Sequence, residues 1–163
     1  MLPNSQVVKV GIAQMDIARE PATIRTSGLG SCVGVVLYDE SRKLAGLVHV
    51  MLPDSSLNRT PQINEAKFAD TGVVAMAELL KRSGAVRLKA KIAGGAQMFQ
   101  FTSDKDSMRI GPRNVEAVKE QLRKLAIQLV AEDTGGNSGR TIEFDPTTSI
   151  LHIRTVNQGV TQL

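Results

Sequence analysis

Two short apolar segments joined by a polar link constrain the fold of this chain more than any other feature. Residues 32–38 have the sequence Cys-Val-Gly-Val-Val-Leu-Tyr, and residues 44–51 have the sequence Leu-Ala-Gly-Leu-Val-His-Val-Met. Runs that are this apolar, this short and this rich in valine are typical of strands buried on both faces. The polar residues 39–43 between them turn the chain back, so the pair is predicted to form a buried hairpin.

Two amphipathic helices are predicted in the second half of the chain. Apolar residues spaced three or four positions apart place one face of the first helix at Ala69, Val73, Met76 and Leu80. Gly84 is expected to end this helix. The same spacing places the face of the second helix at Val115, Val118, Leu122, Leu125 and Leu129. Asn114 is expected to cap its start and Gly135 to end it.

The remaining apolar segments predict further strands at residues 7–12, 22–26, 88–93, 140–144 and 150–154. The order along the chain is therefore strands, helix, strand, helix and strands. This order favours an α+β fold with mostly antiparallel sheet. The length of 163 residues suits one domain spanning residues 1–163, with room for a substantial core.

Composition and charge exclude several classes of protein. Hydrophobic residues make up 42% of the chain and charged residues 22%, which is ordinary for a globular protein. The net charge of +4 is spread along the chain and aromatics make up only 3%, whereas nucleic-acid binders cluster basic residues and add aromatics. We therefore expect no nucleic-acid partner. No apolar stretch is long enough to insert into a membrane and no signal peptide opens the chain, so we expect a cytoplasmic location.

A glycine-rich segment precedes the first hairpin strand and leads to the single cysteine. It has the sequence Ser-Gly-Leu-Gly-Ser over residues 27–31, directly before Cys32. Glycines permit positive φ, and turn N–H groups, those of Gly30, Ser31 and above all Cys32, can then face a developing oxyanion. A nucleotide-binding loop with this Gly-x-Gly would require a following helix, whereas a strand follows here. The simpler alternative is a tight turn that carries a buried thiol.

His49 lies on the return strand of the predicted hairpin, near the same end as Cys32. A neighbouring imidazole can accept the thiol proton, so we expect its nitrogen near hydrogen-bonding range of the sulfur and a thiolate formed in advance. Thr26 is the candidate for a third group that orients the imidazole. The alternatives are a satisfied core histidine for His49, and Thr23, Ser27 or Ser31 in the place of Thr26. One cysteine allows no internal disulfide and no metal site built from several cysteines.

The segments around these residues resemble the CheD family of chemoreceptor glutamine deamidases. The resemblance is carried by Thr-Ser-Gly-Leu-Gly-Ser-Cys-Val at 26–33 and His-Val-Met-Leu-Pro at 49–53. It continues in the glycine pairs at 94–95 and 135–136 and in the Ile-Gly-x-Arg-Asn segment at 110–114. The resemblance covers nearly the whole chain, with the segments in matching order.

The resemblance implies a cysteine hydrolase that converts glutamine side chains of methyl-accepting chemotaxis receptors to glutamate. The triad would be Cys32 as nucleophile, His49 as base and Thr26 as the residue supporting the histidine, with no metal or organic cofactor. The implied fold is a layered α/β/β sandwich, similar to the catalytic domain of the cytotoxic necrotizing factor toxins. The implied partners are the receptors and CheC, a chemotaxis phosphatase that competes with them.

Two other functions remain open at this stage. The chain is alternatively a non-catalytic regulator that acts by binding receptors and CheC, or a cysteine protease or transglutaminase that shares the same chemistry. Phe99 and Phe101 are candidates for exposed apolar anchors toward a receptor or CheC, although apolar residues at such spacing are commonly core.

Overall fold

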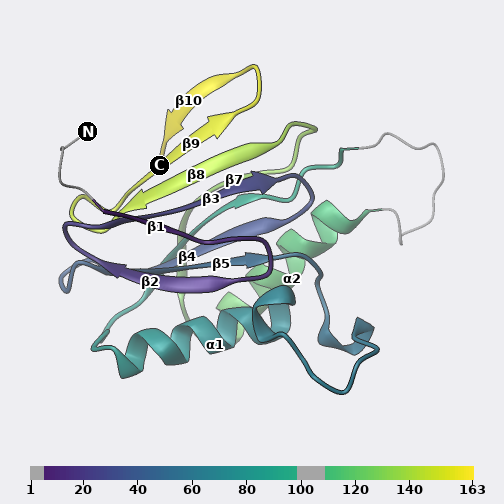
Figure 1. Cartoon of the computed structure of the whole chain (residues 1–163), viewed down its shortest axis with the longest axis horizontal. Helices are drawn as coiled ribbons and strands as arrows, with labels where there is room; N and C mark the ends of the chain where they lie inside the picture. Colours follow the sequence, from purple (N-terminus) through teal and green to yellow (C-terminus); the bar gives the residue numbers. More distant parts are fainter. Residues whose placement is uncertain (1–5, 99–108) are drawn as a thin grey trace.

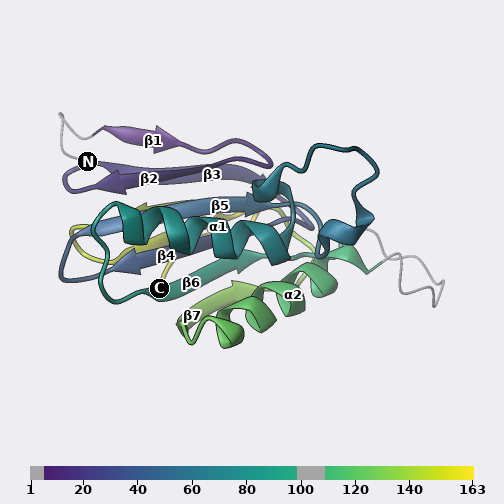
Figure 2. The same ribbon diagram turned by 90° about the horizontal axis from the view of Figure 1, so that it is seen from below.

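The computed structural model describes residues 6–98 and 109–163, which form three layers (Figures 1 and 2). The outer sheet has the order β1-β3-β8-β9-β10, from β1 (Val7–Lys9), β3 (Thr23–Leu29), β8 (Arg140–Asp145), β9 (Ile150–Thr155) and β10 (Gly159–Gln162). The central sheet has the order β2-β5-β4-β6-β7, from β2 (Met15–Arg19), β5 (Leu44–Val50), β4 (Val33–Asp39), β6 (Lys89–Gly94) and β7 (Gln128–Thr134). Helices α1 (Ala69–Arg82) and α2 (Ile110–Lys124) cover the free face of the central sheet, as Figure 2 shows.

This architecture confirms the expected α+β sandwich with helical, central and outer layers. Of the strand pairings within the described residues, only β1–β3 and β6–β7 are parallel. Two short 3₁₀ helices, Ser55–Leu57 and Glu65–Lys67, lie in the connection between β5 and α1. No helix in the described part of the chain is long and apolar enough to cross a membrane.

The predicted hairpin is confirmed at the centre of the fold. β4 and β5 pair antiparallel from Val33 opposite Val50 to Asp39 opposite Leu44, and every residue of both strands is buried. Alternate β4 residues serve two cores. Val33, Val35 and Leu37 pack toward the helices, whereas Val36 and Tyr38 pack toward the outer sheet. These strands are continuously apolar because they lie in the middle layer, where both of their faces are buried.

The predicted boundaries of the second helix are wrong at both ends. The helix begins at Ile110, with Arg109 at the N-cap position but no capping side-chain bond, and Asn114 lies inside it, fully buried. It ends at Lys124, because Ala126 adopts a left-handed φ of 56° and the Ile127 N–H donates to the Leu122 carbonyl at 2.9 Å. This is a Schellman ending. Leu129, expected on the helix, lies in β7 beside β6.

Besides β7, two further strands, β2 and β10, were not predicted, and the first strand is shorter than expected. The segment 7–12 contains only β1, after which a turn at residues 11–14 leads into β2. β2 is an edge strand that pairs only with β5, and β10 is an exposed edge strand that pairs only with β9. Edge strands carry no strong apolar pattern of their own, because neighbours cover only part of them.

The left-handed conformation of Ala126 gives a stability prediction. Replacing Ala126 by glycine removes the steric cost of its Cβ and should raise the free energy of unfolding by about 0.5–1 kcal/mol. Ala117→Gly in the middle of α2 is the matched control and should lower the same quantity by about 1 kcal/mol. Urea denaturation of both variants measures the difference. Destabilisation by both substitutions to the same degree would contradict the assigned helix end.

Candidate active site

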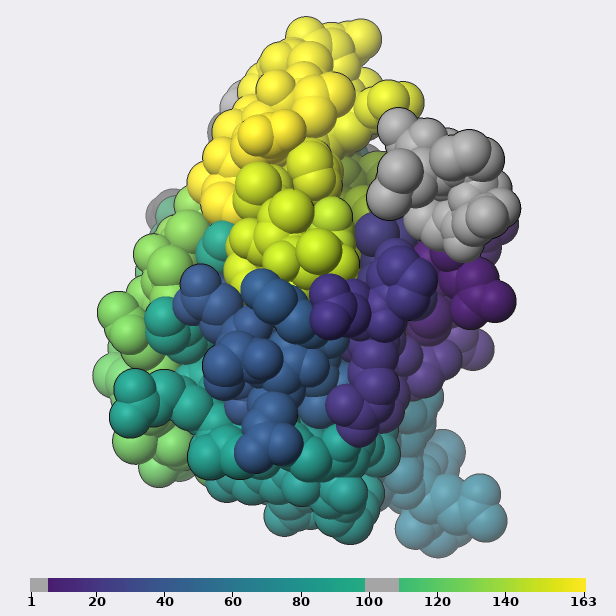
Figure 3. Space-filling model, turned by 90° about the vertical axis from the view of Figure 1, so that its left-hand side faces the viewer, coloured from purple at the N-terminus to yellow at the C-terminus, as the bar shows by residue number. Residues whose placement is uncertain are grey.

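The candidate residues meet at one end of the sandwich, the right-hand end in Figure 1. The turns β1–β2 and β3–β4, the end of β5 and the start of α2 all lie there. Figure 3 shows the other end of the molecule, where the β4–β5 turn at residues 39–43 is prominent. The site is therefore assembled from segments that are far apart in the sequence.

Backbone hydrogen bonds hold the turn that carries Cys32. β3 extends to Leu29, further than predicted, so the turn comprises residues 30–32. A neighbouring strap of residues 94–96 clamps this turn, since the Ala96 N–H donates to the Gly30 carbonyl at 2.9 Å and the Gly95 N–H to the Cys32 carbonyl at 2.8 Å. Gly94 has a φ of 117°, and a Cβ there would lie 2.3 Å from the Cys32 carbonyl oxygen. Only glycine allows this approach.

His49 is fully buried and faces the outer sheet. It pairs with Gly34 across the β4–β5 ladder, and paired residues point to the same face of a sheet. Cys32 lies in the turn just before β4, and its half-buried side chain packs against the core between the two sheets, on that same face. The backbone of His49 is fixed from the other side, where its N–H donates to Gln14 at 3.0 Å and its carbonyl accepts from Ala13 at 3.1 Å.

The absence of a side chain at Gly34 lets the two sheets approach beside His49. A Cβ on Gly34 would lie 2.7 Å from Cδ1 of Ile142 in the outer sheet. Ile142 pairs with Thr26 across the β3–β8 ladder, so Thr26 also faces the central sheet at this point. The hydroxyl of Thr26 consequently lies 2.7 Å from Nδ1 of His49.

The hydrogen bonds of Thr26 determine the tautomer of His49. The Thr26 hydroxyl donates its single hydrogen to the Val10 carbonyl at 2.8 Å. Towards His49 the hydroxyl oxygen therefore accepts, and a neutral His49 carries its hydrogen on Nδ1. Nε2 is then the unprotonated nitrogen. Among the described residues this buried atom has no hydrogen-bond partner, so its lone pair is free to accept a proton.

The expected contact between Cys32 and His49 is not made in this structure. Nε2 of His49 has no partner in the described part of the chain, and the sulfur is therefore outside hydrogen-bonding geometry. Hydrogen bonds of nucleophile and base are commonly long before substrate binds. The structure joins Thr26 to His49 by a hydrogen bond and places Cys32 on the same face, without a hydrogen bond between Cys32 and His49.

Burial sets the charge state of the pair and corrects the expectation of a thiolate formed in advance. Desolvation raises the pKa of the Cys32 thiol, while its own N–H, bonded to the sulfur, lowers that pKa by a smaller amount. Desolvation also lowers the pKa of His49 to about 4. At neutral pH the resting pair is therefore a neutral thiol beside a neutral imidazole.

The three candidate oxyanion donors differ in availability. The Gly30 N–H already donates to the Gly28 carbonyl at 3.1 Å, which makes it a poor donor to substrate. The N–H groups of Ser31 and Cys32 have no oxygen acceptor within the residues that the structure describes. These two groups can face an oxyanion.

Asn114 is a polar residue at this end that the sequence assigned to the wrong role. Its amide nitrogen donates to the carbonyls of Ser31 and Met51, at 2.9 and 2.8 Å. Its place in the Arg-Asn segment that resembles the CheD family was the one signal pointing to it. The expected partner anchors, Phe99 and Phe101, lie outside the described residues. Across residues 6–98 and 109–163, no group of three His, Cys, Asp or Glu side chains is arranged to hold a metal.

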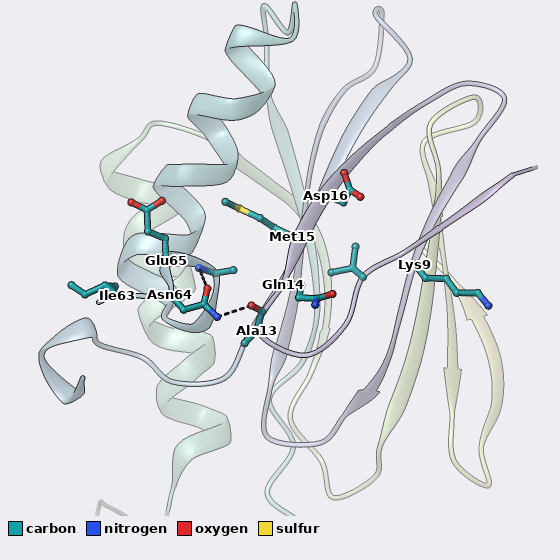
Figure 4. Close-up of a pocket in the computed structure, with 10 residues that line it drawn as sticks. Lys9, Ala13, Gln14, Met15, Asp16, Ile63, Asn64 and Glu65 are labelled. Atoms are coloured by element: carbon teal, nitrogen blue, oxygen red, sulfur yellow. Dashed lines mark hydrogen bonds between the residues drawn. The ribbon is translucent and has the colours of Figure 1, made fainter. Parts of the chain in front are cut away.

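A cavity of about 540 Å³ adjoins the turn that holds His49 (Figure 4). Polar and apolar residues from β1, the β1–β2 turn, β2 and the segment 63–66 line it, and Asn64 donates to the Ala13 carbonyl at 3.0 Å. Cys32 is not among the lining residues. The cavity therefore lies beside the site and does not contain the nucleophile candidate.

The neutral thiol gives a prediction for alkylation of Cys32. Because iodoacetamide reacts with the thiolate and burial raises the thiol pKa, the folded protein should react more slowly at pH 7 than the unfolded chain. The rate should rise with pH, with its midpoint above that of the unfolded chain in guanidinium chloride. Mass spectrometry of the labelled protein follows the reaction. A rate that is already at its plateau below pH 7 would indicate a thiolate–imidazolium pair instead.

The comparisons with known proteins all indicate the same family. The family described as CheD, chemotactic sensory transduction, matches residues 51–155. A Bacillus subtilis protein named "Chemoreceptor glutamine deamidase CheD" is 61% identical, over 94% of this chain and 93% of that protein. A protein of the same name from Bacillus velezensis is 59% identical, over 98% of this chain and 98% of that protein. Another from Halalkalibacterium halodurans is also 59% identical, over 95% of this chain and 97% of that protein.

The family match starts just after His49, whereas the relatives also span Thr26, Cys32 and His49. Since the match covers more than half of the chain and the relatives align over nearly all of it, this chain belongs to the CheD family.

Proposed function

We propose that this chain, a chemoreceptor glutamine deamidase, hydrolyses receptor glutamine side chains with Cys32 as nucleophile and His49 as general base. Thr26 is the positioning residue of the triad. The observation that carries this proposal is the buried hydrogen bond between Thr26 and Nδ1 of His49, which leaves Nε2 unprotonated on the face that carries Cys32. The names of relatives about 60% identical supply the reaction and the substrate class.

The first half of the reaction forms a thioester. Nε2 of His49 takes the thiol proton as the sulfur attacks the carboxamide carbon, so the thiolate forms only during attack. The N–H groups of Cys32 and Ser31 stabilise the oxyanion. His49 then donates its Nε2 proton to the amide nitrogen, the carbon–nitrogen bond breaks and ammonia leaves.

The second half consumes one water. Neutral His49 takes a proton from this water, whose oxygen attacks the thioester carbonyl. The carbon–sulfur bond breaks, His49 returns the proton to the sulfur, and the glutamate side chain is released. The net reaction converts a carboxamide and water to a carboxylic acid and ammonia, and no metal or organic cofactor takes part.

Receptor and CheC are proposed to use the same end of the molecule. Four of the large apolar side chains that are exposed in the described residues belong to segments at this end: Ile12 in the β1–β2 turn, Leu57 and Ile63 in the connection from β5 to α1, and Met98 after the strap. Met98 lies against Gly30, since a Cβ on that glycine would be 3.3 Å from Cγ of Met98. Competition between receptor and CheC for this end is the regulation that the family resemblance implies. The cytoplasmic location stays a prediction of the sequence.

Removal of the nucleophile tests the catalytic proposal. A receptor cytoplasmic fragment incubated with the protein should show glutamine converted to glutamate, a gain of about 1 Da per site by mass spectrometry. Cys32→Ala should abolish the conversion while the variant unfolds at the same temperature as the parent. Conversion by Cys32→Ala at the parent rate would refute the triad. Recovery of signalling by that inactive variant in a deletion strain would favour the regulatory alternative.

Substitution of Thr26 tests control of the His49 tautomer. Thr26→Val keeps the side-chain shape but removes the hydroxyl that accepts from Nδ1, so kcat should fall roughly 10²-fold. Thr26→Ser restores the hydroxyl and should recover most of that loss, which a packing role for the threonine methyl group would not predict. Initial rates of ammonia release on the receptor fragment give kcat. Equal activity of the valine and serine variants would contradict the role of the hydroxyl.

A further inference from the structure

Asn114 is a fully buried polar side chain that the triad does not use. It lies inside α2 and has no exposed surface. Its Nδ2 donates to the carbonyl of Ser31 at 2.9 Å and to that of Met51 at 2.8 Å, which uses both hydrogens of the amide. Its Oδ1 is buried and has no partner in the described residues. Burying an amide oxygen without a hydrogen-bond partner lowers the stability of the fold. We therefore attribute the presence of Asn114 to the two hydrogen bonds that its nitrogen donates.

Both accepting carbonyls belong to segments that carry the reacting groups. Ser31 directly precedes Cys32, and Met51 lies two positions after His49. The β4–β5 ladder stops at the pair Val33 and Val50, so neither carbonyl lies within it. Asn114 joins the two strand ends just beyond their last pair. It thereby fixes the Cys32 turn relative to the strand of His49.

The bond to Ser31 also determines where the N–H of Cys32 points. A peptide group is planar and trans, so the carbonyl of Ser31 and the N–H of Cys32 point in opposite directions within one plane. Asn114 holds the carbonyl toward α2, which lies on the helical side of the central sheet. The Cys32 N–H is therefore aimed to the opposite side, toward the Cys32 sulfur and the face that His49 shares.

We propose that Asn114 is a positioning residue that aims the Cys32 N–H at the oxyanion by holding the peptide between Ser31 and Cys32. The inference rests on the proposed deamidation. A rotated peptide would carry its N–H away from the developing charge while leaving the thiol and His49 in place. Loss of one well-aimed donor reduces kcat strongly, because the donor acts on the transition state and not on the bound ground state.

The test uses an isosteric variant of the full chain. Asn114→Asp keeps the shape, donates at most one hydrogen bond and turns carboxylate oxygen toward two carbonyls. We expect kcat on the receptor fragment to fall about 10- to 100-fold with KM changed less than about threefold. Asn114→Ser is the second variant and serves if the aspartate variant does not fold. Val118→Ala, a buried substitution on the same face of α2, is the control for lost stability and should leave kcat unchanged.

Alkylation of Cys32 separates positioning of the peptide from general damage to the turn. Iodoacetamide forms no oxyanion on a carbonyl, and serine introduces no charge beside the thiol, so its reaction with folded Asn114→Ser should stay within about threefold of the parent. Parental kcat in a folded Asn114 variant, or an equal loss of kcat in Val118→Ala, would overturn the inference. A fall in alkylation that matches the fall in kcat would also overturn it. If the proposed function itself is wrong, the parent protein will show no conversion that depends on Cys32. This result distinguishes failure of the proposed function from failure of the inference about Asn114.

Discussion

The hydrogen bond between Thr26 and His49 joins the two sheets, and the rest of the site depends on it. Thr26 belongs to the outer sheet and His49 to the central sheet, yet their polar atoms lie 2.7 Å apart inside an apolar core. Facing sheets are commonly separated by about 10 Å. The sheets approach here because Gly34 has no side chain and Ile142 occupies the space above it. The same packing that builds the core therefore also fixes the imidazole and its tautomer.

The turn that carries Cys32 is held by hydrogen bonds from parts of the chain that are distant in sequence. The strap at residues 94–96 binds the carbonyls of Gly30 and Cys32, and Asn114 binds the carbonyl of Ser31 between them. With three successive carbonyls engaged in hydrogen bonds, the peptide planes of the turn cannot rotate freely. The N–H groups of Ser31 and Cys32 have no oxygen acceptor in the described residues, which leaves them available to substrate in the proposed reaction. A rigid, preorganised donor costs no reorganisation during the reaction.

Burial protects the site from premature reactivity. The same desolvation that keeps His49 neutral also keeps the Cys32 thiol protonated, so the resting protein has neither an imidazolium nor a thiolate. A neutral thiol is a weak nucleophile toward oxidants and alkylating agents. In the proposed mechanism, proton transfer to Nε2 is tied to attack on the carboxamide, where the oxyanion donors stabilise the charge that develops. This arrangement favours selectivity for a bound amide over general thiol chemistry.

The sequence by itself determined the buried hairpin, helix α1, the layered α+β class and the identity of Cys32, His49 and Thr26 as candidates. These depend on local patterns: apolar periodicity, a glycine turn and residue types that suit one chemistry. Only the tertiary structure decided that residues 128–134 form β7, that Asn114 binds the Cys32 turn and that the thiol is neutral. The leucine spacing that ends at Leu129 is compatible with either a helix or a strand. The strand forms because β6 supplies backbone hydrogen-bond partners for β7. Hydrogen-bond partners and desolvation likewise depend on which segments pack together, and no local pattern specifies that packing.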